Sequence, residues 1–171
     1  KMQTILTIKT LFTVSRADDK ENFDNILEQT KRQVDDIIDE ILNNKHTLVN
    51  IIDLKVFDDY TYYHSVNVAV LSIIIGVRLK LTRDKLYKLG MSAILHDIGK
   101  VFIDKELLNK KEKLTEEELN IIREHPRLGY NYLKDKYNLP FAVYQGIFQH
   151  HEKYNGKGYP QGLSGKQIHL Y

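Results

Sequence analysis

Apolar residues recur at helical spacing through most of this chain, and that pattern favours helices over strands. In the segment from Glu21 to Leu42 they form a single stripe, while charged residues occupy the opposite face. The stripe consists of Phe23, Ile26, Leu27, Val34, Ile37, Ile38, Ile41 and Leu42. The chain contains only three prolines, so few of these segments are interrupted. We therefore expect an all-α fold in which amphipathic helices form a bundle.

Two further helices are predicted in the middle of the chain. The first begins near Asp59 or Thr61 and ends at about Leu79. One face of this helix holds His64, Val68, Leu71 and Ile75. The second helix follows Thr82, and Gly99 is a natural stop for it. One side of this second helix holds Leu89, Ser92, Ala93 and His96.

The last third of the chain is predicted to contain two more helices and a loop. A capping box beginning at Thr115 starts one helix, which we expect to end near Pro126 with His125 on its inner face. Pro140 suits the first turn of the next helix, which should end around His150 and His151. The segment 154–165 holds four of the nine glycines and must be a loop.

Length and charge limit the domain organisation and the partners. The 171 residues suit one domain with a substantial core, or one domain with a short appendage. We expect residues 1–20 to be a linker or the tail of an upstream module, and residues 21–171 to form a domain truncated at its C-terminal side. A net charge of +2 gives no argument for a DNA partner or for membrane contact by this segment. A secretory signal is not evident, so the cytoplasm is the expected location.

An adjacent His96-Asp97 pair stands at the end of an apolar run, where ionisable side chains need partners. A divalent metal ion suits both residues, and because the chain has no cysteine, any ion must be held by nitrogen and oxygen. A lone histidine of this kind is usually a hydrogen-bonded core or surface residue. Here five of the seven histidines lie on apolar faces or at helix ends, which indicates a metal-dependent phosphohydrolase. These five are His64, His96, His125, His150 and His151.

Hydrolysis of a phosphodiester explains why these residue types occur together. Two metal ions about 3.5–4 Å apart supply a bridging hydroxide as nucleophile and neutralise charge on the phosphoryl oxygens. Asp97 can bridge two such ions while the histidines fill terminal positions. His150 and His151, if both are helical, point about 100° apart and can both face the centre. Lys100 follows Asp97 by three residues and is placed to hold a phosphate oxygen.

Five motifs occur in one order: YHS at 63–65, HDIGK at 96–100, EHP at 124–126, HHE at 150–152 and GYP at 158–160. In this the chain resembles the HD-GYP family of HD-domain phosphohydrolases. The resemblance implies an HD-domain helical bundle that hydrolyses cyclic di-GMP to pGpG, GMP or both. It assigns metal ligation to His64, His96, Asp97, His125, His150 and His151, and catalysis to Asp97 and Lys100. The substrate-binding residues that it implies are Lys100, Gly158, Tyr159, Pro160, Lys153 and Lys157.

The resemblance also implies cofactors and partners, and the departures from the family pattern leave alternatives open. Tyr60 stands where some relatives have a glutamate that recruits a third ion, so we expect two divalent ions, iron or manganese, although zinc and nickel also suit the ligands. An upstream sensory domain and a homodimer or GGDEF-type partner are implied. The family has a further aspartate ligand downstream of the glycine-rich loop, which either follows Tyr171 or is lacking. If it is lacking, the alternative is a catalytically impaired receptor for a cyclic dinucleotide or a partner protein. An HD-domain hydrolase of nucleotides or RNA is a third hypothesis.

Overall fold

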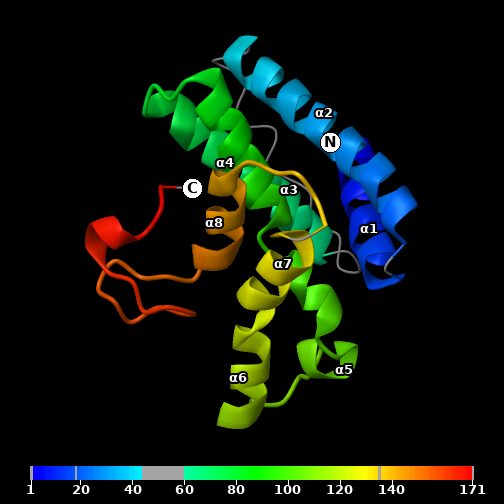
Figure 1. Cartoon of the computed structure of the whole chain (residues 1–171), viewed down its shortest axis with the longest axis vertical. Helices are drawn as coiled ribbons and strands as arrows, with labels where there is room; N and C mark the ends of the chain where they lie inside the picture. Colours follow the sequence, from blue (N-terminus) through cyan, green and yellow to red (C-terminus); the bar gives the residue numbers. More distant parts are fainter. Residues whose placement is uncertain (1, 18, 44–59, 135, 171) are drawn as a thin grey trace. The chain divides into compact units, whose positions relative to one another are not determined.

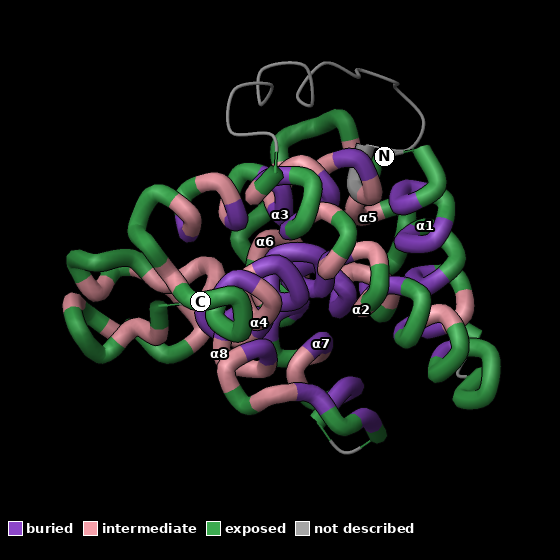
Figure 2. The backbone as a smooth tube through the Cα atoms, turned by 90° about the horizontal axis from the view of Figure 1, so that it is seen from above, coloured by how far each residue is buried: buried purple, intermediate pink, exposed green. Residues whose placement is uncertain are grey.

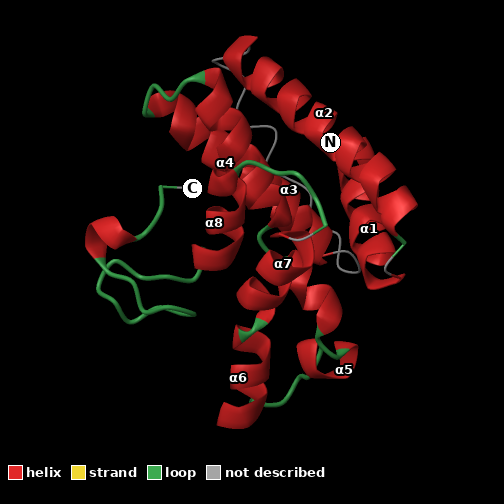
Figure 3. Cartoon of the chain, viewed as in Figure 1, coloured by secondary structure: helices red, strands yellow, loops and turns green. Residues whose placement is uncertain are grey.

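The computed structural model describes residues 2–17, 19–43, 60–134 and 136–170, and their secondary structure is helical (Figure 3). Within these ranges no strand forms, and the only ladder contact is an isolated antiparallel bridge between Asn155 and Ser164. The all-α prediction is therefore confirmed. The chain divides into two compact units, Lys1–Leu95 and His96–Tyr171.

The first unit contains four helices: α1 (Met2–Ala17), α2 (Lys20–Asn43), α3 (Tyr60–Arg78) and α4 (Arg83–Leu95). Helices α1 and α2 lie side by side as a hairpin, and α3 packs closely against α4 (Figure 1). The backbone of Lys80 adopts the left-handed conformation, with φ at 56°, in the tight turn between α3 and α4. No helix within the described ranges is long and apolar enough to cross a membrane.

The apolar stripe predicted on α2 forms much of the core of the first unit. Phe23, Leu27, Val34, Ile38 and Ile41 are all buried. Figure 2 shows buried segments in purple along α2. Burying each such side chain contributes roughly 1.5–3 kcal/mol to folding. The amphipathic pattern of this segment is thus explained by packing within its own unit.

Residues 2–17, whose periodicity is ambiguous in the sequence, form α1. Ile5, Ile8, Leu11 and Phe12 make its buried face. A side-chain hydrogen bond also ties α1 to α2, because Gln33 Nε2 donates to Thr7 Oγ1 at 2.8 Å. The assignment of residues 1–20 to a linker or an upstream module stays a prediction.

Helix α3 buries a different face from the one that carries its histidine. Leu71 and Ile75, predicted on the same face as His64, are 41% and 59% exposed. The buried face of α3 is formed by Tyr63, Val66, Ala69, Val70 and Ile73. Sequence spacing therefore identifies which residues share a face, but it does not say which face is covered.

The second unit carries most of the candidate site. Its elements are η3 (Ile98–Phe102), α5 (Lys105–Leu108), α6 (Glu116–Arg123), α7 (His125–Lys134), α8 (Phe141–Gln149) and η4 (Gly165–Gln167). The predicted capping box is present, since the Thr115 side chain accepts from Glu118 N and the Glu118 side chain accepts from Thr115 N. Pro140 is the N-cap of α8, as expected for a helix that starts there.

One predicted boundary in this unit is wrong. The sequence indicated a helix that ends near Pro126, whereas α6 ends at Arg123 and a new helix, α7, begins at His125. A proline lacks a backbone N–H and suits the first turn of a helix, so Pro126 belongs to a start rather than an end. This break places His125 at the first position of α7.

Candidate metal centre

The HDIGK segment, residues 96–100, directly follows α4 and includes the start of η3. It packs against α7 where Gly99 meets Gly129. A Cβ atom on Gly99 would lie 1.9 Å from the backbone oxygen of His125 and 2.6 Å from Gly129 N. Gly99 therefore does not act as the predicted helix stop, because α4 already ends at Leu95. Instead, the absence of a side chain lets the backbone after Asp97 touch the first turn of α7. This close approach brings Asp97 and His125 together.

His150 and His151 enter the site from the end of α8, which packs against α7. His150 is the C-cap of α8, and His151 lies beyond it in a turn. The expectation that both residues sit on a helix about 100° apart is therefore wrong. Their ring centroids are 4.3 Å apart, and each ring also lies about 5 Å from that of His125, at 5.1 and 5.0 Å.

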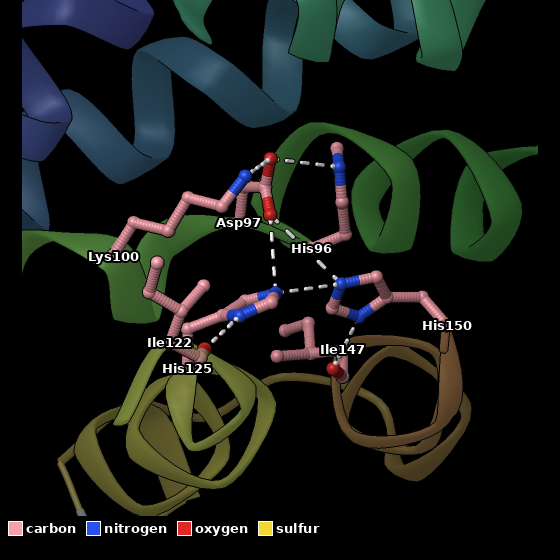
Figure 4. Close-up of polar contacts among 7 residues, drawn as sticks. All are labelled: His96, Asp97, Lys100, Ile122, His125, Ile147 and His150. Atoms are coloured by element: carbon pink, nitrogen blue, oxygen red, sulfur yellow. Dashed lines mark hydrogen bonds and ion pairs between the residues drawn. The ribbon is translucent and has the colours of Figure 1, made fainter. Parts of the chain in front are cut away.

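Asp97 is the centre of the cluster, and its two carboxylate oxygens contact different partners (Figure 4). Oδ1 lies 3.3 Å from His125 Nε2 and 3.9 Å from His150 Nε2. Oδ2 lies 3.2 Å from His96 Nε2 and 2.7 Å from Lys100 Nζ. The Asp97 side chain is only 2% exposed, so its charge depends on these neighbours.

Backbone carbonyls fix the orientation of two of the imidazoles. Nδ1 of His125 lies 2.8 Å from the carbonyl oxygen of Ile122, and Nδ1 of His150 lies 2.8 Å from that of Ile147 (Figure 4). A carbonyl oxygen only accepts, so Nδ1 carries the proton in both rings. In a neutral ring Nε2 then presents a lone pair, and both lone pairs point toward Asp97. Metal-bound histidines in proteins typically make such a second hydrogen bond.

The donor set fits a divalent metal ion. The two Nε2 atoms of His125 and His150 are 3.0 Å apart, and two unprotonated nitrogens at this distance repel unless a cation lies near both. Two ligand atoms of one metal ion lie about 3 Å apart, which is the range of this distance and of the 3.3 Å between His125 Nε2 and Asp97 Oδ1. His125, His150 and His151 also form a group whose ligand atoms all lie within 4.8 Å.

The electrostatics of the cluster keep the ligand atoms of His150, His151 and Asp97 unprotonated. Burial, reinforced by the neighbouring imidazoles, lowers the pKa of His150 to about 2. Burial also lowers the pKa of His151 to about 4. Burial by itself raises the pKa of Asp97, but its contacts with His125 and His96 and the positive charge of Lys100 outweigh it, so this pKa lies well below its usual range. Neutral imidazoles and a carboxylate are the forms that bind a metal.

The glycine-rich loop is attached to the cluster through His151. The Tyr159 ring stacks on the His151 ring with 4.5 Å between centroids and 16° between planes. A Cβ on Gly158 would lie 2.3 Å from Lys153 N, so this position needs glycine for the backbone to approach so closely. The Tyr159–Pro160 peptide bond is cis. Lys153 and Lys157 are exposed, and their role as substrate contacts stays a prediction.

The second unit thus brings together five of the six predicted ligands: His96, Asp97, His125, His150 and His151. The sixth, His64, lies on α3 in the first unit, and its role as a ligand stays a prediction.

Two features that shape the site are not predicted from the sequence: the carbonyl contacts of Ile122 and Ile147, and the contacts of Glu152. Ile122 and Ile147 each precede a histidine at a helix boundary by three residues. From that spacing the carbonyl contacts of His125 and His150 can be predicted. Glu152 is the last residue of the HHE motif, and the motif by itself predicts no role for it.

Comparisons with known proteins identify relatives of this chain. A family model described as HD domain matches residues 39–171. The chain is 38% identical over 137 residues to "Cyclic di-GMP phosphodiesterase PA4108" of Pseudomonas aeruginosa, covering 80% of this chain and 33% of that protein. It is 31% identical over 138 residues to "3'3'-cGAMP-specific phosphodiesterase 1" of Vibrio cholerae, covering 78% of this chain and 30% of that protein.

A solved structure shows the same architecture. The structure described as Bd1817, a HDG"Y"P protein from Bdellovibrio bacteriovorus, matches with a TM-score of 0.79 and 25% sequence identity. The match covers 97% of this chain and 52% of that chain. The chain therefore spans about a third of the length of the curated relatives named above and about half of this structural relative.

Proposed function

The chain belongs to the HD domain family, as its HD-GYP motifs predicted, and from this premise we propose that it carries the catalytic site of a metal-dependent phosphodiesterase acting on cyclic di-GMP. The observation that carries the proposal is the meeting of Asp97 Oδ1 with the Nε2 atoms of His125 and His150, at 3.3 and 3.9 Å. Relatives named as phosphodiesterases of cyclic di-GMP support the substrate class.

The chain's own residues have distinct tasks in this proposal. His64, His96, Asp97, His125, His150 and His151 are the residues that would hold two divalent ions, iron or manganese. Such ions, when bound, act as Lewis acids on a phosphate and lower the pKa of water. The carbonyls of Ile122 and Ile147 keep two rings in the binding orientation. Lys100, whose Nζ lies 2.7 Å from Asp97 Oδ2, contacts a phosphate oxygen of the substrate.

The products that we propose are pGpG, GMP or both, with the backbone of Gly158–Pro160 forming one wall of the substrate site. Lys153 and Lys157 provide further phosphate contacts. The cytoplasmic location, an upstream sensory domain, and a homodimer or a GGDEF-type partner remain predictions from the resemblance.

The proposal is tested by turnover and metal content measured on the same samples. The chain is loaded anaerobically with iron(II) or manganese(II), the bound metal is counted, and cyclic di-GMP and 3'3'-cGAMP are each supplied as substrate. We expect about two ions per chain, a linear product from cyclic di-GMP, and slower turnover of 3'3'-cGAMP. Asp97→Asn should lose both metal and turnover, because a neutral amide is a much weaker ligand for divalent ions than a carboxylate.

Asp84→Asn is the matched control, because Asp84 is an exposed carboxylate on α4 that pairs only locally with Lys88. It should retain full metal content and rate. A metal-loaded chain that binds cyclic di-GMP without forming product would overturn the enzyme and favour the receptor alternative. Full turnover in Asp97→Asn would remove Asp97 from the site.

A further inference from the structure

Glu152 follows the two histidines of the site directly, yet its carboxylate points into the glycine-rich loop. Its Oε1 atom accepts from Gln161 N at 2.6 Å, and its Oε2 atom accepts from Leu163 N at 2.8 Å. Both oxygens of one charged group are thus used on two backbone donors of the same loop. Hydrogen bonds from N–H groups to a carboxylate are stronger than those between neutral groups.

These two bonds close the loop around Tyr159. On one side, Tyr159 N donates to His151 O at 3.2 Å and the two rings stack. On the other side, Gln161 and Leu163 are held by Glu152, whose own backbone N donates to Gln149 O at 2.8 Å at the end of α8. The loop that follows α8 (Figure 1, orange to red) is therefore anchored at its near and far sides to residues 151 and 152.

We propose that Glu152 is a positioning residue that holds the 156–163 loop in place, so that Tyr159 stays stacked on His151. The stack limits rotation of the His151 ring, and this ring lies against those of His125 and His150. Without the carboxylate, the donors of Gln161 and Leu163 lose their acceptor, and the loop is held only by the Tyr159 backbone bond and the ring stack. The loop then leaves its ordered position for part of the time.

The consequence for catalysis rests on the proposed function. If the substrate binds only when the loop is ordered, its apparent affinity falls by the fraction of time that the loop is ordered. A loop ordered for about a tenth of the time raises KM about tenfold and leaves kcat nearly unchanged once substrate is saturating. A general loss of folding would instead lower the active fraction, reducing kcat at constant KM.

The test compares Glu152→Ala and Glu152→Gln with Glu112→Ala, an exposed glutamate in the segment between α5 and α6. Hydrogen exchange is measured at the Gln161 and Leu163 amides, with amides of α7 as an internal reference. In Glu152→Ala both loop amides should exchange about tenfold faster or more, while α7 is unchanged. In Glu152→Gln the single amide oxygen retains one acceptor, so one of the two loop amides should stay protected.

Trypsin cleavage after Lys157, within the loop, provides a second readout that needs neither metal nor substrate. Cleavage there should accelerate in Glu152→Ala relative to cleavage after Lys113, which lies outside the loop. Unchanged exchange at Gln161 and Leu163 in Glu152→Ala overturns the proposal, as does a fall in kcat with unchanged KM. Should Glu152→Ala not fold, the exchange pattern of Glu152→Gln decides.

Failure of the proposed function has a different signature. If the parent chain hydrolyses no cyclic dinucleotide, the phosphodiesterase is rejected, while faster exchange in Glu152→Ala still supports the anchoring of the loop. If the parent chain is active and the loop amides of Glu152→Ala remain protected, the phosphodiesterase stands and the role of Glu152 is rejected.

Discussion

Replacing Gly99 by alanine tests whether the contact between the HDIGK segment and α7 builds the site. The new Cβ would lie 1.9 Å from the backbone oxygen of His125, whereas close carbon–oxygen contacts in proteins are about 3.3 Å or longer. The two segments must therefore separate by about 1.4 Å. The obstacle is backbone on all sides, since Gly129 N and His125 C would lie at 2.6 and 2.9 Å, and no side chain can rotate away.

We expect Gly99→Ala to lower the free energy of unfolding by about 3 kcal/mol, which is the upper end of the usual effect of overpacking a core. For a chain of 171 residues this lowers Tm by about 6–12 °C. Moving Asp97 from His125 by about 1 Å should also reduce turnover about a hundredfold. Both are measured on the same sample, Tm by circular dichroism and turnover with cyclic di-GMP under manganese.

Gly129→Ala, on the opposite side of the same contact, is the matched control. Its Cβ would lie 3.0 Å from Gly99 N and 3.1 Å from a methyl of Ile98, so a small adjustment relieves it. We expect Gly129→Ala to lower the free energy of unfolding by about 1 kcal/mol and to reduce turnover only modestly. Gly99→Ala with a Tm within about 2 °C of the parent chain and normal metal content would refute the reasoning.

Three further predictions concern other parts of the chain. Lys100→Gln should raise KM for cyclic di-GMP about 10–100-fold while metal content is retained, because a charged hydrogen bond to substrate is lost; unchanged steady-state kinetics would remove Lys100 from the substrate site. The pKa values of His150 and His151, about 2 and about 4, lie below the usual 6.5, so both residues take up protons on unfolding. The metal-free chain should therefore lose stability as the pH falls from about 6.5 toward 4, and less steeply in His151→Gln; a Tm that is constant over this range contradicts it. Thr115→Ala should lower the free energy of unfolding by about 1 kcal/mol through loss of the capping box, measured by urea denaturation, with Thr10→Ala on the exposed face of α1 as its control.

Much of the helical pattern was readable from the sequence because its causes are local. The stripe on α2, the capping box at Thr115 and the start of α8 at Pro140 each depend on residues within a few positions of one another. The start of α7 at His125 was missed because a proline is compatible with both the end of one helix and the first turn of the next. The histidines and Asp97 were also predicted as metal ligands, because their residue types suit a metal ion and because they occur in the HD-GYP motifs.

The sequence by itself therefore determined the helical class and the residue types of the candidate site, while tertiary structure decided how these residues are arranged. His125 and His150 are 25 residues apart, and their Nε2 atoms meet only because α7 packs against α8. Gly99 looks like a helix stop until its distance to His125 is known, and Glu152 has no visible role until the loop folds back onto it. Propensity and capping act between neighbours in the chain, whereas ligand geometry is set by backbone approaches between segments that only the folded state brings into contact.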